Sequence, residues 1–160
     1  MNDAASQSAT QAIVLDEVFP HAPEILWATL TSGALMARWL MPPSGFEAVV
    51  GKRFSFQTTP GGAWDGVIHC EVLEVSPNRR LAFAWRSGHA SNVGYGALLD
   101  TVVSFDLSPA EGGTRLRLVH AGFVAPSNDA TYRNLSEGWP KVFKQLDSVA
   151  AEQAPPTSLH

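Results

Sequence analysis

The side chains best suited to chemistry in this sequence are few and well separated. The histidines are His21, His69, His89, His120 and His160, and the one cysteine is Cys70. Metal sites built on His and Cys use recurring short spacings between their ligands. None of these histidines stands at such a spacing from another histidine or from Cys70. The sequence therefore predicts no metal site and no bound cofactor.

Cys70 and His69 are neighbours on a run that is typical of a strand, so their side chains point to opposite faces. They cannot form a catalytic Cys–His pair through their own strand. We expect Cys70 in the core, because free cysteine is often buried, and His69 facing solvent. Asp65 and Asp100 stand at strand starts, where turn or edge roles are expected rather than acid–base work. With no catalytic set identified, the sequence favours a binding protein over an enzyme.

His120 is the polar residue that the pattern directs inward. It ends the series Leu116, Leu118 and His120, whose members share one face of a strand. Its ring should therefore point into the space between the sheet and a covering helix. Three roles remain open: a core histidine bonded to a neighbour, a polar anchor for a ligand, and a general base.

A helix over residues 135–150 is predicted to cover that face of the sheet. Its large apolar residues form one stripe of a 3.6-residue period: Leu135, Trp139, Val142, Phe143, Leu146 and Val149. Gly138 and Pro140 are poor helix formers inside this stretch. Because the stripe keeps its phase across Pro140, we expect one helix with a kink there. A helix that begins at Pro140 is the alternative.

Most of the chain before this helix alternates apolar and polar residues, as strands do. Strands are predicted at 12–19, 52–58, 67–75, 81–86, 100–107 and 114–120, with a bulge near Glu74 and a short strand or extended loop at 46–50. Two short helices, at 23–30 and 33–40, follow the first strand, and Ser32 is suited to cap the second. The order predicts an α+β fold with a long helix across a curved antiparallel sheet.

Composition is that of an ordinary single domain. The chain has 160 residues, is 45% hydrophobic and has a net charge of −4 without any run of Lys or Arg, so nucleic acid and membrane are not expected partners. No apolar run approaches the ~20 residues that span a bilayer, and no signal-peptide pattern is present. We expect a cytoplasmic protein with a disordered tail over 1–11, one domain over 12–152 and a loose end over 153–160.

Several segments, taken in order, resemble a known family. They are Ala22-Pro23 followed by Trp27, Arg38-Trp39, EVLEVSPNRRLAFAW (71–85), GTRLRLVHAGF (113–123) and GWPKVF (138–143). Together they are similar to the START-like SRPBCC superfamily, within the branch of the activator of heat-shock-protein-90 ATPase homologues. The resemblance spans about residues 12–150. It implies a helix-grip (START/Bet v 1-like) fold, in which a curved antiparallel sheet wraps around a long C-terminal helix and leaves a cavity between them.

The resemblance further implies that a small hydrophobic molecule binds in that cavity. The side chains expected to line it, by strand parity and helix stripe, are Trp39, Phe54, Phe56, Phe83, Trp85, His120, Trp139 and Phe143. The alternative is that these rings only fill the core. The kink would place Trp139 at the cavity edge, and the glycine-rich segment 87–97 would form a flexible rim over its mouth.

Two other functions remain open for the same fold. Some relatives carry out cyclase or aromatase chemistry in the cavity, so an enzyme of cyclase, aromatase or hydrolase type is one alternative. A chaperone-binding relative gives the branch its name, so a protein-binding module with an exposed apolar patch is the other. A second copy of the chain, giving a homodimer, is a further candidate partner.

Overall fold

The structure is a computed structural model that describes residues 10–153. Its elements are β1 (Thr10–Phe19), α2 (Pro23–Thr31), α3 (Gly33–Trp39), β2 (Arg53–Gln57), β3 (Val67–Ser76), β4 (Arg80–Ser87), β5 (Leu99–Ala110), β6 (Gly113–Val124) and α4 (Asp129–Gln153). Residues 10 and 11, expected in the tail, belong to β1, and residue 153, expected in the loose end, belongs to α4. The rest of the expected tail and loose end lies outside the described residues.

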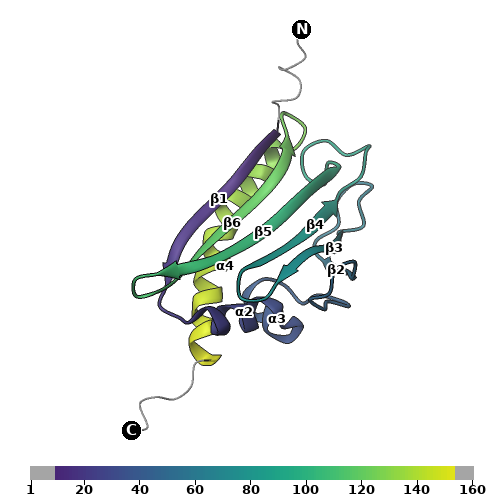
Figure 1. Ribbon diagram of the computed structural model, residues 1–160. Coiled ribbons are helices and arrows are strands. Elements are labelled where there is room, and N and C mark those ends of the chain that lie inside the picture. The colour runs from purple at the N-terminus through teal and green to yellow at the C-terminus, as the bar shows by residue number, and fades with distance from the viewer. Residues whose placement is uncertain (1–9, 154–160) are drawn as a thin grey trace.

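The six strands form one antiparallel sheet in the order β1–β6–β5–β4–β3–β2. From β2 to β6 each strand pairs with the next one along the chain. Only β1 lies away from its successor, at the far edge beside β6, and α2 and α3 occupy the connection between β1 and β2. The sheet curves around α4, and α2 and α3 lie at one end of it (Figure 1). The predicted α+β helix-grip arrangement is therefore confirmed.

The long helix begins six residues earlier than the apolar stripe predicted. α4 runs unbroken from Asp129 to Gln153 with Pro140 inside it, so the alternative start at Pro140 is wrong. Asn128 precedes the first turn, where its side chain accepts a hydrogen bond from the N–H of Val124 and donates one to the carbonyl of Leu98. The first turns were missed because their sequence, DATYRN, is mostly polar. No helix within residues 10–153 is both long and apolar enough to cross a membrane.

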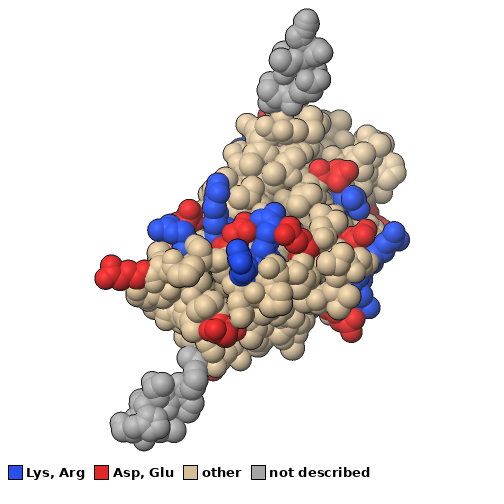
Figure 2. Space-filling model, in the orientation of Figure 1, with Lys and Arg blue, Asp and Glu red and all other residues tan. Residues whose placement is uncertain are grey.

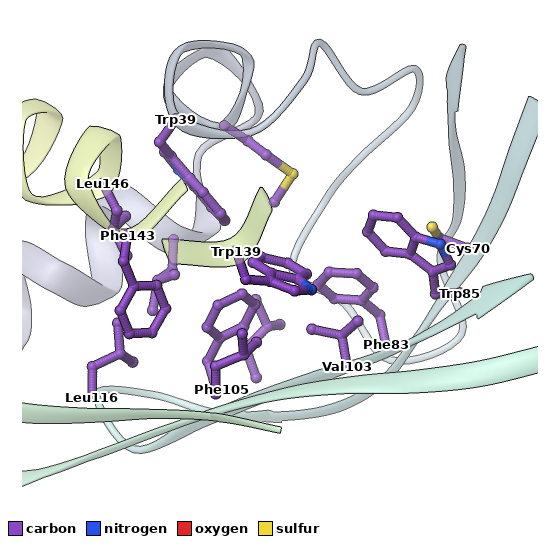
Figure 3. Close-up of a cluster of buried hydrophobic side chains, with 14 of the residues drawn as sticks. Trp39, Cys70, Phe83, Trp85, Val103, Phe105, Leu116, Trp139, Phe143 and Leu146 are labelled. Atoms are coloured by element: carbon purple, nitrogen blue, oxygen red, sulfur yellow. The ribbon is translucent and has the colours of Figure 1, made fainter. Parts of the chain in front are cut away.

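The stripe of α4 packs on the inner face of the sheet as the 3.6-residue spacing predicts. Trp139, Phe143 and Leu146 are buried. Phe143 meets Phe19 of β1 edge to face, with ring centroids 5.4 Å apart, and Trp139 meets Phe105 of β5 at 6.1 Å. Figure 3 shows Trp139 at the centre of this cluster, between the helices and the strands.

Several local predictions also hold. The Ser32 hydroxyl caps α3 by accepting a hydrogen bond from the N–H of Leu35 at 3.2 Å. The register of β3 against β4 shifts between Val72 and Glu74, which is the expected bulge. Residues 46–50 form an extended loop and turn rather than a strand.

Replacing Leu146 by aspartate is expected to abolish cooperative unfolding. Leu146 is completely buried, so the substitution places an unpaired charge in the core. Such changes cost about 4 kcal/mol or more, against a total stability of roughly 5–15 kcal/mol for a domain. Urea unfolding followed by tryptophan fluorescence measures the effect. Lys144→Asp, at an exposed position of the same helix, should unfold cooperatively, and a well-folded Leu146→Asp variant would contradict the packing of α4.

Candidate functional site

A buried chain of hydrogen bonds joins α4 to the centre of the sheet through His120. The indole Nε1–H of Trp139 donates to Nδ1 of His120 at 3.1 Å. Nε2 of His120 lies 2.8 Å from Oγ1 of Thr101, and that hydroxyl donates to the carbonyl oxygen of Trp85 at 2.8 Å. The side chains of Trp139, His120 and Thr101 are almost completely removed from solvent.

The direction of these hydrogen bonds determines the tautomer of His120. Nδ1 accepts from an indole N–H, which is only a donor, so the proton of the neutral ring lies on Nε2. Nε2–H then donates to Thr101, whose own hydroxyl hydrogen is directed to Trp85. Burial lowers the pKa of His120 to about 3, because desolvation penalises the imidazolium form. His120 thus has both ring nitrogens bonded within the protein, as in a core histidine.

A cavity of about 240 Å³ opens beside Trp85, between the sheet and the first turns of α4. The sheet side supplies residues near the ends of β2, β3 and β4, and the other side supplies three residues of α4. The lining consists of Met41, Thr58, Trp64, Ile68, Trp85, Ser87, Tyr95, Gly96, Ala97, Thr131, Asn134 and Leu135. Large apolar side chains make up much of it.

Only one of the eight residues expected at a ligand site lines this cavity, namely Trp85. The other seven lie buried in the core around α4: Trp39, Phe54, Phe56, Phe83, His120, Trp139 and Phe143. Trp139, expected at the cavity edge, is 1% exposed and packs between Trp85 and Phe105. Strand parity and helix stripe identify the inward face, but they do not say where along that face the packing is incomplete.

The cavity wall includes loop residues, which strand parity cannot predict. Trp64 belongs to the turn segment PGGAWDG and Tyr95 to the segment 87–97, and their rings lie 5.7 Å apart. A tryptophan inside a glycine-rich turn was the available signal, because such a large apolar side chain needs a surface to cover. Tyr95, Gly96 and Ala97, from the 87–97 segment, also line the cavity.

Hydrogen bonds tie the two loops of this wall together. The amide of Asn92 donates to the carbonyl of Gly61 at 2.8 Å and accepts from the N–H of Ala63 at 2.9 Å. The Tyr95 hydroxyl donates to the carbonyl of Thr59. A Cβ at Gly61 would approach the Tyr95 ring to 2.7 Å, so a larger residue there would displace this ring. The two loops of this wall are therefore held together by hydrogen bonds.

Charged side chains gather on the outer face of the sheet and not in the cavity. Figure 2 shows a band of both signs across that face. Ion pairs join neighbouring strands there, Arg80 with Asp106 and Arg115 with Asp16. Arg86, at the end of β4, pairs outward with Asp100 at 3.1 Å. Among the described residues that line the cavity, none is Lys, Arg, Asp, Glu or His. Residues 10–153 contain no group of three or more His, Cys, Asp or Glu side chains suited to a metal ion.

Comparison with known proteins agrees with the fold. The sequence profile described as "Activator of Hsp90 ATPase homolog 1-like protein" matches residues 20–151. The chain belongs to this family. Protein MLL2253 from Mesorhizobium loti, whose crystal structure is solved, is 34% identical, with a TM-score of 0.77 over 91% of this chain and 100% of that one.

More distant members of the fold cover nearly the same length. CalU16 from Micromonospora echinospora is 20% identical, with a TM-score of 0.67 over 94% of this chain and 80% of that one. The Aha1 dimer from Colwellia psychrerythraea is 21% identical, with a TM-score of 0.65 over 88% and 96% of the two chains. A comparison with curated proteins gives no match. At these identities the two structures show a shared fold.

Replacing His120 by glutamine should remove part of the pH dependence of stability. Below a pH of about 6.5 an unfolded chain takes up a proton at this histidine. The native ring stays neutral down to a pKa of about 3, so the unfolded state binds more protons between these values. His120 alone should then lower the wild type's free energy of unfolding by up to about 1.4 kcal/mol for each pH unit between 6.5 and 3.

Urea unfolding from pH 7 to 4 measures this term as the difference between the wild-type and His120→Gln curves. His69→Gln, at an exposed position on β3, is the control and should follow the wild type. Parallel curves for the wild type and His120→Gln would contradict the buried neutral histidine.

Cys70 should be unreactive in the native protein. The side chain is 4% exposed, and burial raises the pKa of its thiol to about 12, so little thiolate is present to attack a reagent. An aromatic disulfide reagent at pH 8 should modify it only after urea is added. Modification of the folded protein at the rate of the unfolded protein would contradict its place in the core.

Proposed function

We propose that this domain binds a small hydrophobic molecule in the cavity between the sheet and the start of α4. The observation that carries the proposal is the lining, in which the aromatic residues Trp64, Trp85 and Tyr95 stand with Ile68 and Leu135 around about 240 Å³. Water in an apolar cavity is poorly hydrogen-bonded, and its release favours an apolar ligand.

The cavity wall is preorganised for such a ligand. The Trp85 ring is supported from behind by Phe56, His120 and Trp139, at centroid distances of 5.8, 5.1 and 6.1 Å. Its backbone carbonyl is bonded to Thr101. The loops that carry Trp64 and Tyr95 are joined by the hydrogen bonds of the Asn92 side chain. A preorganised wall strengthens binding because little conformational freedom is lost on association.

A protein-binding module is the second candidate, and exposed apolar side chains near the same end of the molecule favour it. Val93 is 96% exposed and Leu98 59% exposed. A groove of about 510 Å³ runs between the tip of their loop and the start of α4. The solved Colwellia relative is titled a dimer, so a second copy of this chain is one partner to test. An enzyme is less well supported, because the described cavity lining offers no acid–base pair.

The neutral fluorophore N-phenyl-1-naphthylamine should bind at one saturable site and quench tryptophan emission. Thr131 lines the cavity from α4, so Thr131→Phe fills the space and should weaken binding at least about tenfold, as expected when a ring-sized volume is removed. Glu137→Phe places the same ring at an exposed position of α4 and should bind the probe like the wild type.

Two results would contradict the proposal. One is equal affinity of the wild type and Thr131→Phe, which would place the probe elsewhere. The other is binding that appears only when the protein is partly unfolded by urea, which would indicate exposed core rather than a native site.

A further inference from the structure

We infer that the cavity selects an uncharged, ring-containing molecule with hydroxyl, carbonyl or amide groups along its edge. This inference rests on the proposed function and adds the chemical class of the ligand.

The described lining of the cavity offers no counter-ion for a charged ligand. The described lining residues carry no ionisable acid or base apart from the phenol of Tyr95. Arg86 is paired outward with Asp100, and His120 stays neutral behind Trp85. An ionised group that entered the cavity would lose hydration without gaining a partner, which is strongly unfavourable. The cavity therefore discriminates against carboxylates, phosphates and ammonium groups.

Free polar groups nevertheless stand on both sides of the cavity. Thr58 and Ser87 line it from the sheet side, and Thr131 and Asn134 line it from α4. Within residues 10–153, none of these four side chains donates or accepts a hydrogen bond. The Tyr95 hydroxyl and the Trp64 indole N–H, in contrast, both donate to backbone carbonyls. Unbonded hydroxyl and amide groups are suited to polar groups on a neutral ligand, directly or through water.

The enclosing rings favour a flat ligand between these polar groups. Trp85 forms one wall, and the pair Trp64 and Tyr95 belongs to the neighbouring loops. Aromatic rings gain most from offset-stacked or edge-to-face contact with another ring. A compact ring system whose polar groups lie at its edge can use the aromatic walls and the free polar groups at once.

A cation does lie nearby, but on the other side of the loop tip. Arg133 and Asp129 line the outer groove together with Val93 and Pro126, and neither charged residue lines the cavity. An anionic molecule attracted to Arg133 would occupy this groove. Arg133→Gln therefore distinguishes binding in the groove from binding in the cavity.

Two probes with one skeleton test the charge selection. N-phenyl-1-naphthylamine is neutral, and 8-anilinonaphthalene-1-sulfonate is the same skeleton with one added sulfonate. The neutral probe should bind at least about tenfold more tightly, because the sulfonate finds no counter-ion in the cavity. Comparable or tighter binding of the sulfonate overturns the inference, and its loss in Arg133→Gln would then assign it to the groove. If neither probe binds saturably, the proposed function itself fails, and this inference with it.

A second pair of compounds tests the polar groups. 2-Naphthol should displace the neutral probe about threefold or more better than naphthalene, the gain expected from one hydrogen bond. The advantage should become smaller in the double variant Thr131→Val with Asn134→Leu, which keeps Thr58 and Ser87 on the sheet side. Ser148→Ala removes a hydroxyl from an exposed position of the same helix and should keep the advantage. Equal displacement by both compounds in the wild type would overturn the hydrogen-bonding part of the inference.

Discussion

The position of Trp139 on the inner face of the sheet is the contact on which the rest of this structure depends. Its ring meets Phe105 and Trp85, each at 6.1 Å, and its N–H is bonded to His120. Packing alone would allow α4 to slide along an apolar surface, because such contacts are not directional. The hydrogen bond is directional, and a buried N–H without an acceptor is strongly unfavourable, so it restricts the helix to one position.

Packing against the sheet is continuous along the second half of α4 and leaves a cavity beside its first turns. From Trp139 to Val149 the stripe of α4 is apolar and fills the space against the sheet. Before Trp139 the helix presents Thr131 and Asn134, which are too short and too polar to fill that space. The cavity lies where these residues oppose the ends of the strands, and loop side chains close its outer wall.

Polar groups are handled differently on the two faces of the sheet. On the outer face, charged residues of neighbouring strands form ion pairs across the sheet, which salt and solvent weaken. On the inner face, His120 and Thr101 are bonded in series and remain neutral. Among the described residues, every fully buried side-chain nitrogen and oxygen has a hydrogen-bond partner. The unbonded groups at the cavity are partly exposed, so a ligand can reach them.

The sequence alone determined the helix stripe, the strands and the bulge in β3, because periods of 3.6 and 2 residues report which side of an element is buried. It also determined that Cys70 and His120 point inward. Only the tertiary structure decided that His120 is bonded on both nitrogens and that the cavity uses Trp64, Tyr95 and Thr131. Periodicity identifies which face of a helix or strand is buried. A cavity depends on where separate loops and the end of a helix come together in space, and a local sequence pattern does not contain this information.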